Sequence, residues 1–182
     1  MPDTSDQIKS LLALAAVVSP RVQIVGIRLA HSNTSSAPPP PETPLRIEHG
    51  LNGEAEANRD SNQIAVRVSF MVRANAADGS EAAEAAFHVE AAFHLGYTIN
   101  SFDGISDEHV QAFGKMNGVY NAWPYWREYV QSTTVRMGFP PLTLPVLTGE
   151  AILKIYQEQE AAAKRDDDSL PEESAEPAPA AR

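Results

Sequence analysis

Apolar and polar residues alternate along two stretches in the middle of the chain. Every second residue is apolar in the sets Ile64, Val66, Val68, Phe70, Val72 and Phe87, Val89, Ala91, Phe93, Leu95, Tyr97. A period of two predicts strands with one buried face. Two weaker strands are predicted at residues 21–31 and 45–51, separated by a loop at 32–44 that holds four consecutive prolines. Short connections between successive strands favour antiparallel pairing, so the first half predicts a four-stranded antiparallel meander.

A helical period appears at both ends of this sheet region. Residues 4–18 place Ile8, Leu11, Leu12, Ala15 and Val18 on one face, with Thr4 and Gln7 spaced as a capping box. A short helix is predicted from the N-cap Ser106 to Asn117-Gly118. The next helix has Pro124 in its first turn and ends at Gly138, and a last helix begins near Glu150. We therefore expect an α+β fold with helices packed on one sheet face and an extra N-terminal helix.

Length and charge divide the chain into three parts. We expect an amphipathic helix at 1–20, one domain at 21–160 and a disordered acidic tail at 161–182. The net charge is −10, and residues 166–182 alone carry −5. This balance argues against nucleic acid or anionic lipid as a partner. The segment LLALAAVV at 11–18 follows two acidic residues and is too short to span a bilayer, so we expect a cytoplasmic protein and no membrane insertion.

The sequence offers no catalytic or metal-binding motif. It has no cysteine, no G-x-S-x-G, no P-loop and no G-x-G-x-x-G. His88, Glu90 and His94 share one face of a predicted strand, but the two histidines lie roughly 20 Å apart along it, too far to bind one ion. His31, His49 and His109 have no partner at ligand spacing. We expect no enzyme activity, no metal and no cofactor.

Aromatic and apolar residues are concentrated between Tyr120 and Leu147. This region contains both tryptophans and three of the five tyrosines. One helix on a small sheet buries one stripe, so the sequence predicts an aromatic surplus that contacts another chain. Two interpretations remain open and are compatible: an interface between copies, and an apolar groove walled by the proline-rich segment FPPLTLPVLTG at 139–149.

Two motifs in this region resemble the SecB protein-export chaperone family. WPYWREYV at Trp123–Val130 is similar to the family's aromatic-Pro-Tyr-x-Arg-Glu helix, and GFPPLTLPV at Gly138–Val146 is similar to its Phe-Pro-x-Leu-x-Leu crossover. The resemblance covers about residues 22–159. It implies a homotetramer built as a dimer of dimers and ATP-independent holding of unfolded or precursor polypeptides, which are kept export-competent and passed to the motor SecA.

The resemblance also implies roles for individual residues. Those expected to line the client groove are Phe139, Pro140, Leu142, Leu144, Val146, Leu147, Ile152 and Ile155. Those expected at the oligomer interface are Trp123, Pro124, Tyr125, Trp126, Tyr129, Val130 and Met137. Glu81 and Glu84 stand near the position where the family docks SecA.

Two other functions stay open at this point. One is a SecB-like chaperone dedicated to a single partner, such as the antitoxin of a toxin–antitoxin system. The other is a structural or small-ligand-binding α+β oligomer that binds no client.

Overall fold

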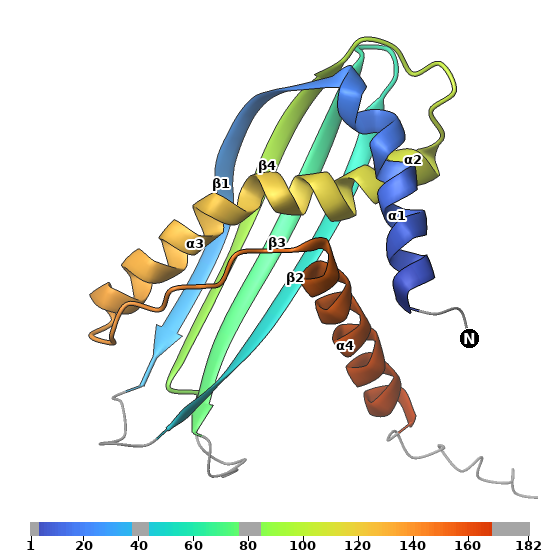
Figure 1. Ribbon diagram of the computed structural model, residues 1–182. Coiled ribbons are helices and arrows are strands. Elements are labelled where there is room, and N and C mark those ends of the chain that lie inside the picture. Colours follow the sequence, from blue (N-terminus) through green and yellow to red (C-terminus); the bar gives the residue numbers. More distant parts are fainter. Residues whose placement is uncertain (1–3, 38–43, 77–84, 169–182) are drawn as a thin grey trace, which may run out of the picture.

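Four long strands form one antiparallel sheet (Figure 1). The computed structural model describes residues 4–37, 44–76 and 85–168. The strands are β1 (Val22–Ser36), β2 (Leu45–Asn58), β3 (Gln63–Ala76) and β4 (Phe87–Ile99). The alternation predicted for β3 and β4 is confirmed, because every second residue of both strands is buried. The expected α+β fold with a four-stranded antiparallel sheet is therefore present.

The strand order differs from that of a simple meander. The order is β1-β4-β3-β2, so β1 pairs with β4 and does not contact β2 as a neighbour. β1 also continues through Ser32–Ser36, which the sequence predicted as loop, and these residues pair with Ala91–Phe87 of β4. Pairing along this whole length satisfies the backbone groups of β4 that β3 leaves open.

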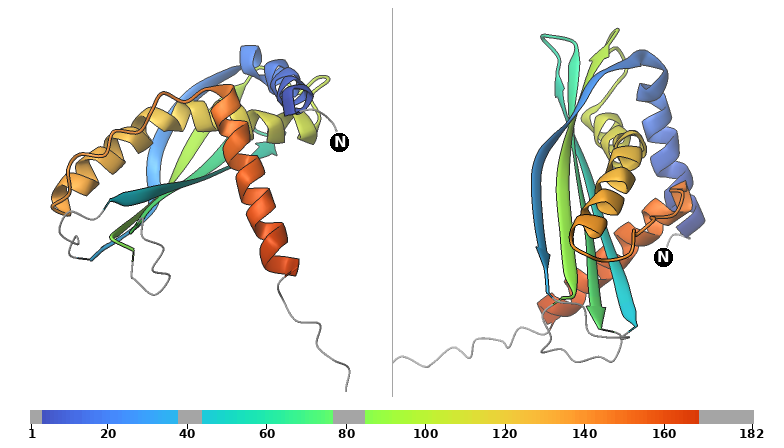
Figure 2. Two further views of the ribbon diagram at one scale, coloured as in Figure 1. Left: turned by 60° about the horizontal axis from the view of Figure 1, so that its bottom comes forward. Right: turned by 90° about the vertical axis from the view of Figure 1, so that its left-hand side faces the viewer.

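The helices lie on one face of the sheet (Figures 1 and 2). They are α1 (Thr4–Val18), α2 (Asp107–Phe113), α3 (Val119–Arg136) and α4 (Gly149–Asp168), with a 3₁₀ turn η1 (Ser19–Arg21) and a π turn η2 (Gly114–Gly118). α1 packs beside α2 and buries Ala15 and Val18. The side chain of Thr4 lies outside what the structure describes, so its capping role stays a prediction.

The helix predicted to end at Asn117-Gly118 continues there instead. Ser106 caps α2 as expected, because its Oγ accepts a bond from the His109 amide. Beyond it, α2, η2 and α3 follow one another without a break. A Cβ on Gly118 would lie 2.6 Å from Cγ1 of Val66, so this glycine lets the helix approach the sheet and does not stop it. Pro124 consequently lies inside α3, at an exposed position, and not in a first turn.

The last helix is longer than predicted. α4 runs to Asp168, so residues 161–168 of the expected disordered tail are helical. Residues 169–182 lie outside the described part of the chain. No helix in the described ranges is both long and apolar enough to cross a membrane.

Candidate functional site

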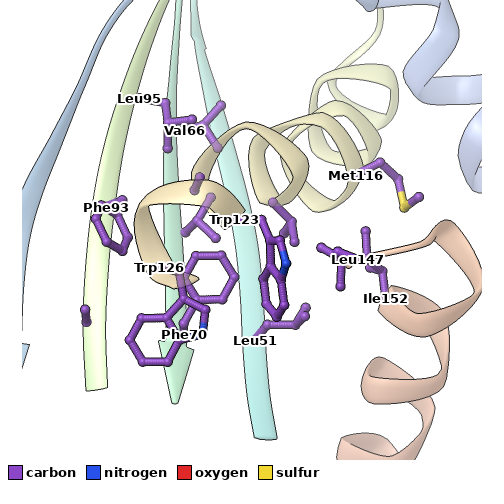
Figure 3. Close-up of a cluster of buried hydrophobic side chains, with 14 of the residues drawn as sticks. Leu51, Val66, Phe70, Phe93, Leu95, Met116, Trp123, Trp126, Leu147 and Ile152 are labelled. Atoms are coloured by element: carbon purple, nitrogen blue, oxygen red, sulfur yellow. The ribbon is translucent and has the colours of Figure 1, made fainter. Parts of the chain in front are cut away.

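Both tryptophans lie in the core of a single copy, between α3 and the sheet (Figure 3). Trp126 is 1% exposed, and its ring stacks on Phe70 with centroids 5.4 Å apart. Trp123 meets the same phenylalanine edge-on at 5.7 Å. Phe70 therefore anchors α3 to the middle of the sheet through two large aromatic contacts.

The proline-rich crossover between α3 and α4 runs back along α3 (Figure 1). The chain reverses at Gly138, whose φ of +85° favours glycine. Two side chains of α3 then hold the crossover. The hydroxyl of Thr134 accepts a bond from the Leu142 amide at 3.1 Å, and the indole of Trp123 donates to the Pro145 carbonyl at 3.1 Å. Proline has no backbone N–H to donate, so the crossover cannot form regular structure of its own, and these bonds from α3 side chains fix its position.

The crossover covers a second stripe of α3, which reduces the predicted aromatic surplus. Of the eight residues expected in the client groove, four are buried in the core of one copy: Phe139, Leu144, Leu147 and Ile152. Leu142 and Ile155 are half-buried, and Pro140 and Val146 are exposed. The four buried side chains can contact a client only if the crossover or α4 moves. Their role in a groove stays a prediction.

The residues expected at the oligomer interface divide in the same way. Trp123, Trp126 and Val130 are buried within one copy. Tyr129 and Met137 are half-buried, and Pro124 and Tyr125 are exposed. Only the latter four present surface to another molecule in this conformation.

An apolar surface lies where α3 faces β1, and the sequence predicted only its α3 members, Tyr125 and Tyr129, as surface for another copy. We call it the β1–α3 patch; its members are Ile27, Leu29, Tyr125 and Tyr129. Leu29 is 46% exposed and Tyr125 is 51% exposed. All four help to line a hollow of about 400 Å³, which also touches Pro124 and Glu128. Two irregularities in the β1 pairing, at Ile24/Gly26 and Leu29/His31, break the alternation that would have revealed this strand face in the sequence.

α4 is attached to the edge strand β2 by a half-buried tyrosine. The Gly53 amide donates to the Tyr156 hydroxyl at 3.1 Å. Burial raises the pKa of Tyr156 to about 12, opposed by the Gly53 hydrogen bond and assisted by the charge of Glu54. The phenol therefore stays protonated at neutral pH and holds α4 beside the end of the crossover.

The described residues bring together no metal-binding cluster. Within residues 4–37, 44–76 and 85–168, no group of three His, Cys, Asp or Glu side chains is placed to hold a metal ion. His88 lies 3.6 Å from Glu90, whereas His94 contacts Arg28 at 2.8 Å. Glu81 and Glu84, the expected SecA contacts, lie outside the described residues.

Comparison with known proteins points to one fold. No family model matches the chain, and no curated protein matches it. A solved SecB-like chaperone of Mycobacterium tuberculosis, Rv1957 in complex with a ChAD peptide of the HigA1 antitoxin, is similar in structure with a TM-score of 0.66 and 24% sequence identity. The match covers 76% of this chain and 99% of that one. A Streptococcus agalactiae protein of unknown function matches with a TM-score of 0.35 and 11% identity, over 69% of this chain and 97% of that one. With its four-stranded sheet, helix-covered face and proline-rich crossover, the protein has a SecB-like fold.

Proposed function

We propose that this chain is an ATP-independent chaperone that binds unfolded polypeptides through exposed apolar surface in the cytoplasm. The observation that carries the proposal is the SecB-like fold, whose solved example holds a peptide. The apolar side chains left open on the helix-bearing side of the sheet support it, because a holding chaperone needs surface that accepts many sequences without geometric selection. No nucleotide or metal takes part in this function.

The crossover is the part of the molecule that we assign to client binding. Val146 is 76% exposed, and Pro140 beside α3 is exposed as well. Only a few side-chain bonds hold the segment, among them those of Thr134 and Trp123. Segments with few tertiary ties open locally at low free-energy cost. Movement of the crossover would expose Leu144 and Ile152 to a client and enlarge the groove.

The β1–α3 patch is the part that we assign to self-association. It lies beside the outer edge of β1, where backbone donors and acceptors have no strand partner in one copy. The homotetramer is proposed on the same basis.

A second form of the function is a chaperone dedicated to one partner. The specific observation in its favour is that the similar Mycobacterium chaperone was solved with an antitoxin peptide. Export through SecA is the other form. Mass spectrometry of the chains that co-purify with the protein from its native cell separates them, since many different precursors indicate export and a single bound chain indicates a dedicated partner.

The client site is tested by removing apolar surface without disturbing the core. Leu142→Ser with Val146→Ser should abolish most suppression of aggregation of a chemically unfolded client, measured by light scattering, because both side chains lie on the crossover and neither is fully buried. Leu12→Ser is the matched control, since Leu12 is 41% exposed on α1. Oligomer mass is measured on every variant.

The outcomes distinguish the proposed function from its alternatives. Loss of holding at unchanged oligomer mass supports a client site on the crossover. Full holding in the crossover variant would reject that assignment. A native protein that never suppresses aggregation would favour the structural or small-ligand-binding oligomer.

A further inference from the structure

The sheet face that carries no helix has a row of charged side chains across all four strands. The register pairs Arg28 of β1 with His94 of β4, His94 with Arg67 of β3, and Arg67 with Glu54 of β2. Three of these four neighbours are basic side chains. Because neighbouring strands are about 4.8 Å apart and β4 lies between β1 and β3, the Cα atoms of the two arginines are roughly 10 Å apart.

The next row along the strands is almost bare of side chains. It consists of Gly26, Gly96 and Ala65, followed by Glu56. We call the depression above these residues the arginine trough: Gly26, Gly96 and Ala65 form its floor, Arg28, His94 and Arg67 form one wall, and Glu54 and Glu56 line its β2 end. Its volume is about 610 Å³. A second hollow of about 710 Å³ adjoins it and shares Val25, Ala65 and Gly96.

The arginines of the trough have no carboxylate partner among the described residues. Arg28 donates to Nδ1 of His94 at 2.8 Å, so that imidazole acts as a neutral acceptor. Burial, then the charges of Arg28 and Arg67, lower the pKa of His94. The carboxylate of Glu54 accepts a bond from Asn52 and forms no ion pair with Arg67 within 4.0 Å. Two guanidinium groups are therefore available to an external anion.

We propose that the arginine trough binds an acidic segment of a partner polypeptide, with two carboxylates on Arg28 and Arg67 and its backbone over Gly26, Gly96 and Ala65. Alternate side chains of an extended segment are about 6.6 Å apart on one face, a spacing that the flexible stems of two arginines readily match. Val25 is 64% exposed in the bulge of β1, and its Cγ2 lies over Gly96, 3.2 Å from where a Cβ would stand, so it gives the segment an apolar contact on the floor.

A chain of carboxylates fits this site better than a small free anion. Arg28 and Arg67 are exposed, and a single exposed ion pair contributes little binding free energy. A segment that engages both arginines, the glycine floor and Val25 at once gains from linking several weak contacts. The trough lies on the opposite face of the sheet from the crossover and the β1–α3 patch, so this binding is separate from the proposed holding of clients.

The test uses the full chain and a labelled, capped peptide in which Glu alternates with Ala, followed by fluorescence anisotropy at low salt. We expect binding that weakens as salt is added. The double variant Arg28→Gln, Arg67→Gln should weaken it at least tenfold, as expected for the loss of two charge-assisted contacts. Arg73→Gln is the matched control because it makes the same charge change on β3, six residues from Arg67, and should leave binding within twofold.

A second measurement requires no variant. Addition of the peptide should shift the backbone NMR signals of Gly26 and Gly96 more than those of Gly53, which faces the helices. Aggregation suppression with an apolar client should be unchanged in the double variant, so failure of the trough and failure of the holding function are separate results.

Four outcomes would overturn the proposal. They are no binding of the Glu/Ala peptide at low salt, equal binding of a Lys/Ala peptide, displacement of the peptide by citrate at equal concentration, and binding that appears only after Glu172, Glu173 and Glu176 are changed to Gln. The third would make the trough a small-anion site, and the fourth would make the chain's own acidic segment its occupant.

Discussion

Trp126 is the largest fully buried side chain on α3. Its indole is 1% exposed and lies parallel to the ring of Phe70, with an interplanar angle of 10°. Trp126→Ala should lower the free energy of unfolding by about 3–5 kcal/mol, because it leaves a large cavity between α3 and β3. Urea denaturation followed by circular dichroism measures this loss.

Tyr125 is the control at the neighbouring position. It is 51% exposed, so Tyr125→Ala should change the free energy of unfolding by less than about 1 kcal/mol. Equal losses in the two variants would show that the indole is not the anchor described here.

The same two residues show what a sequence can predict at this scale. The helical period puts adjacent residues such as Trp126 and Tyr125 on different faces of a helix, and the structure buries the first and exposes the second. It could not predict that the crossover would cover a further stripe of α3, because a proline-rich segment has no period of its own. The aromatic surplus was therefore overestimated, and Trp123 and Trp126 entered the expected interface although one copy buries both.

At the scale of elements, the hydrophobic pattern predicted each strand but not the neighbours of β1. Alternation reports which face of a strand is buried, whereas strand order depends on which edge the chain returns to. Here the last strand, β4, returns to pair with the first strand, β1, so β1 and β2 lie at opposite edges of the sheet. A similar limit applies to Gly118, since glycine ends helices in many sequences but here meets Val66 at close range and lets the helix continue.

The attachment of α4 to β2 predicts a loss of stability at high pH. Tyr156 has a pKa of about 12 in the folded protein, above the value near 10 of an unfolded tyrosine. The folded state binds this proton more tightly, so the stabilisation is complete below about pH 10 and is lost as pH rises from 10 to 12. In the wild type this loss should lower the unfolding free energy by on the order of 1–2 kcal/mol between pH 10 and 12, and Tyr156→Phe should abolish that part of the fall.

The comparison between variants isolates this effect. Burial also raises the pKa of Tyr97 and Tyr120, so wild type and Tyr156→Phe share a remaining slope. Tyr125→Phe serves as the exposed control. If Tyr156→Phe keeps the whole wild-type slope in chemical denaturation between pH 9 and 12, the phenol is not held by Gly53 and α4 is attached in another way.

At the scale of the whole molecule, one copy covers its sheet face incompletely. Ile27 and Leu29 of β1 line a hollow with Tyr125, and Leu29 and Tyr125 are 46% and 51% exposed. The outer edge of β1 is unpaired over the same strand. A second copy placed against this edge would bury apolar side chains and pair backbone groups together, which is how two sheets join at an open edge.

The oligomer is therefore tested at the β1–α3 patch and not at the buried tryptophans. Leu29→Ser with Tyr125→Ser should shift the molecular mass, measured by light scattering after size-exclusion chromatography, towards that of one 19.7 kDa chain. Val135→Ser, which removes a valine that is 53% exposed near the end of α3, should leave the mass of the native assembly unchanged. A native protein that is monomeric at every concentration would refute self-association through this patch. In that case the patch would remain open as additional apolar surface for a client, and the double variant should then weaken aggregation suppression instead of changing the mass.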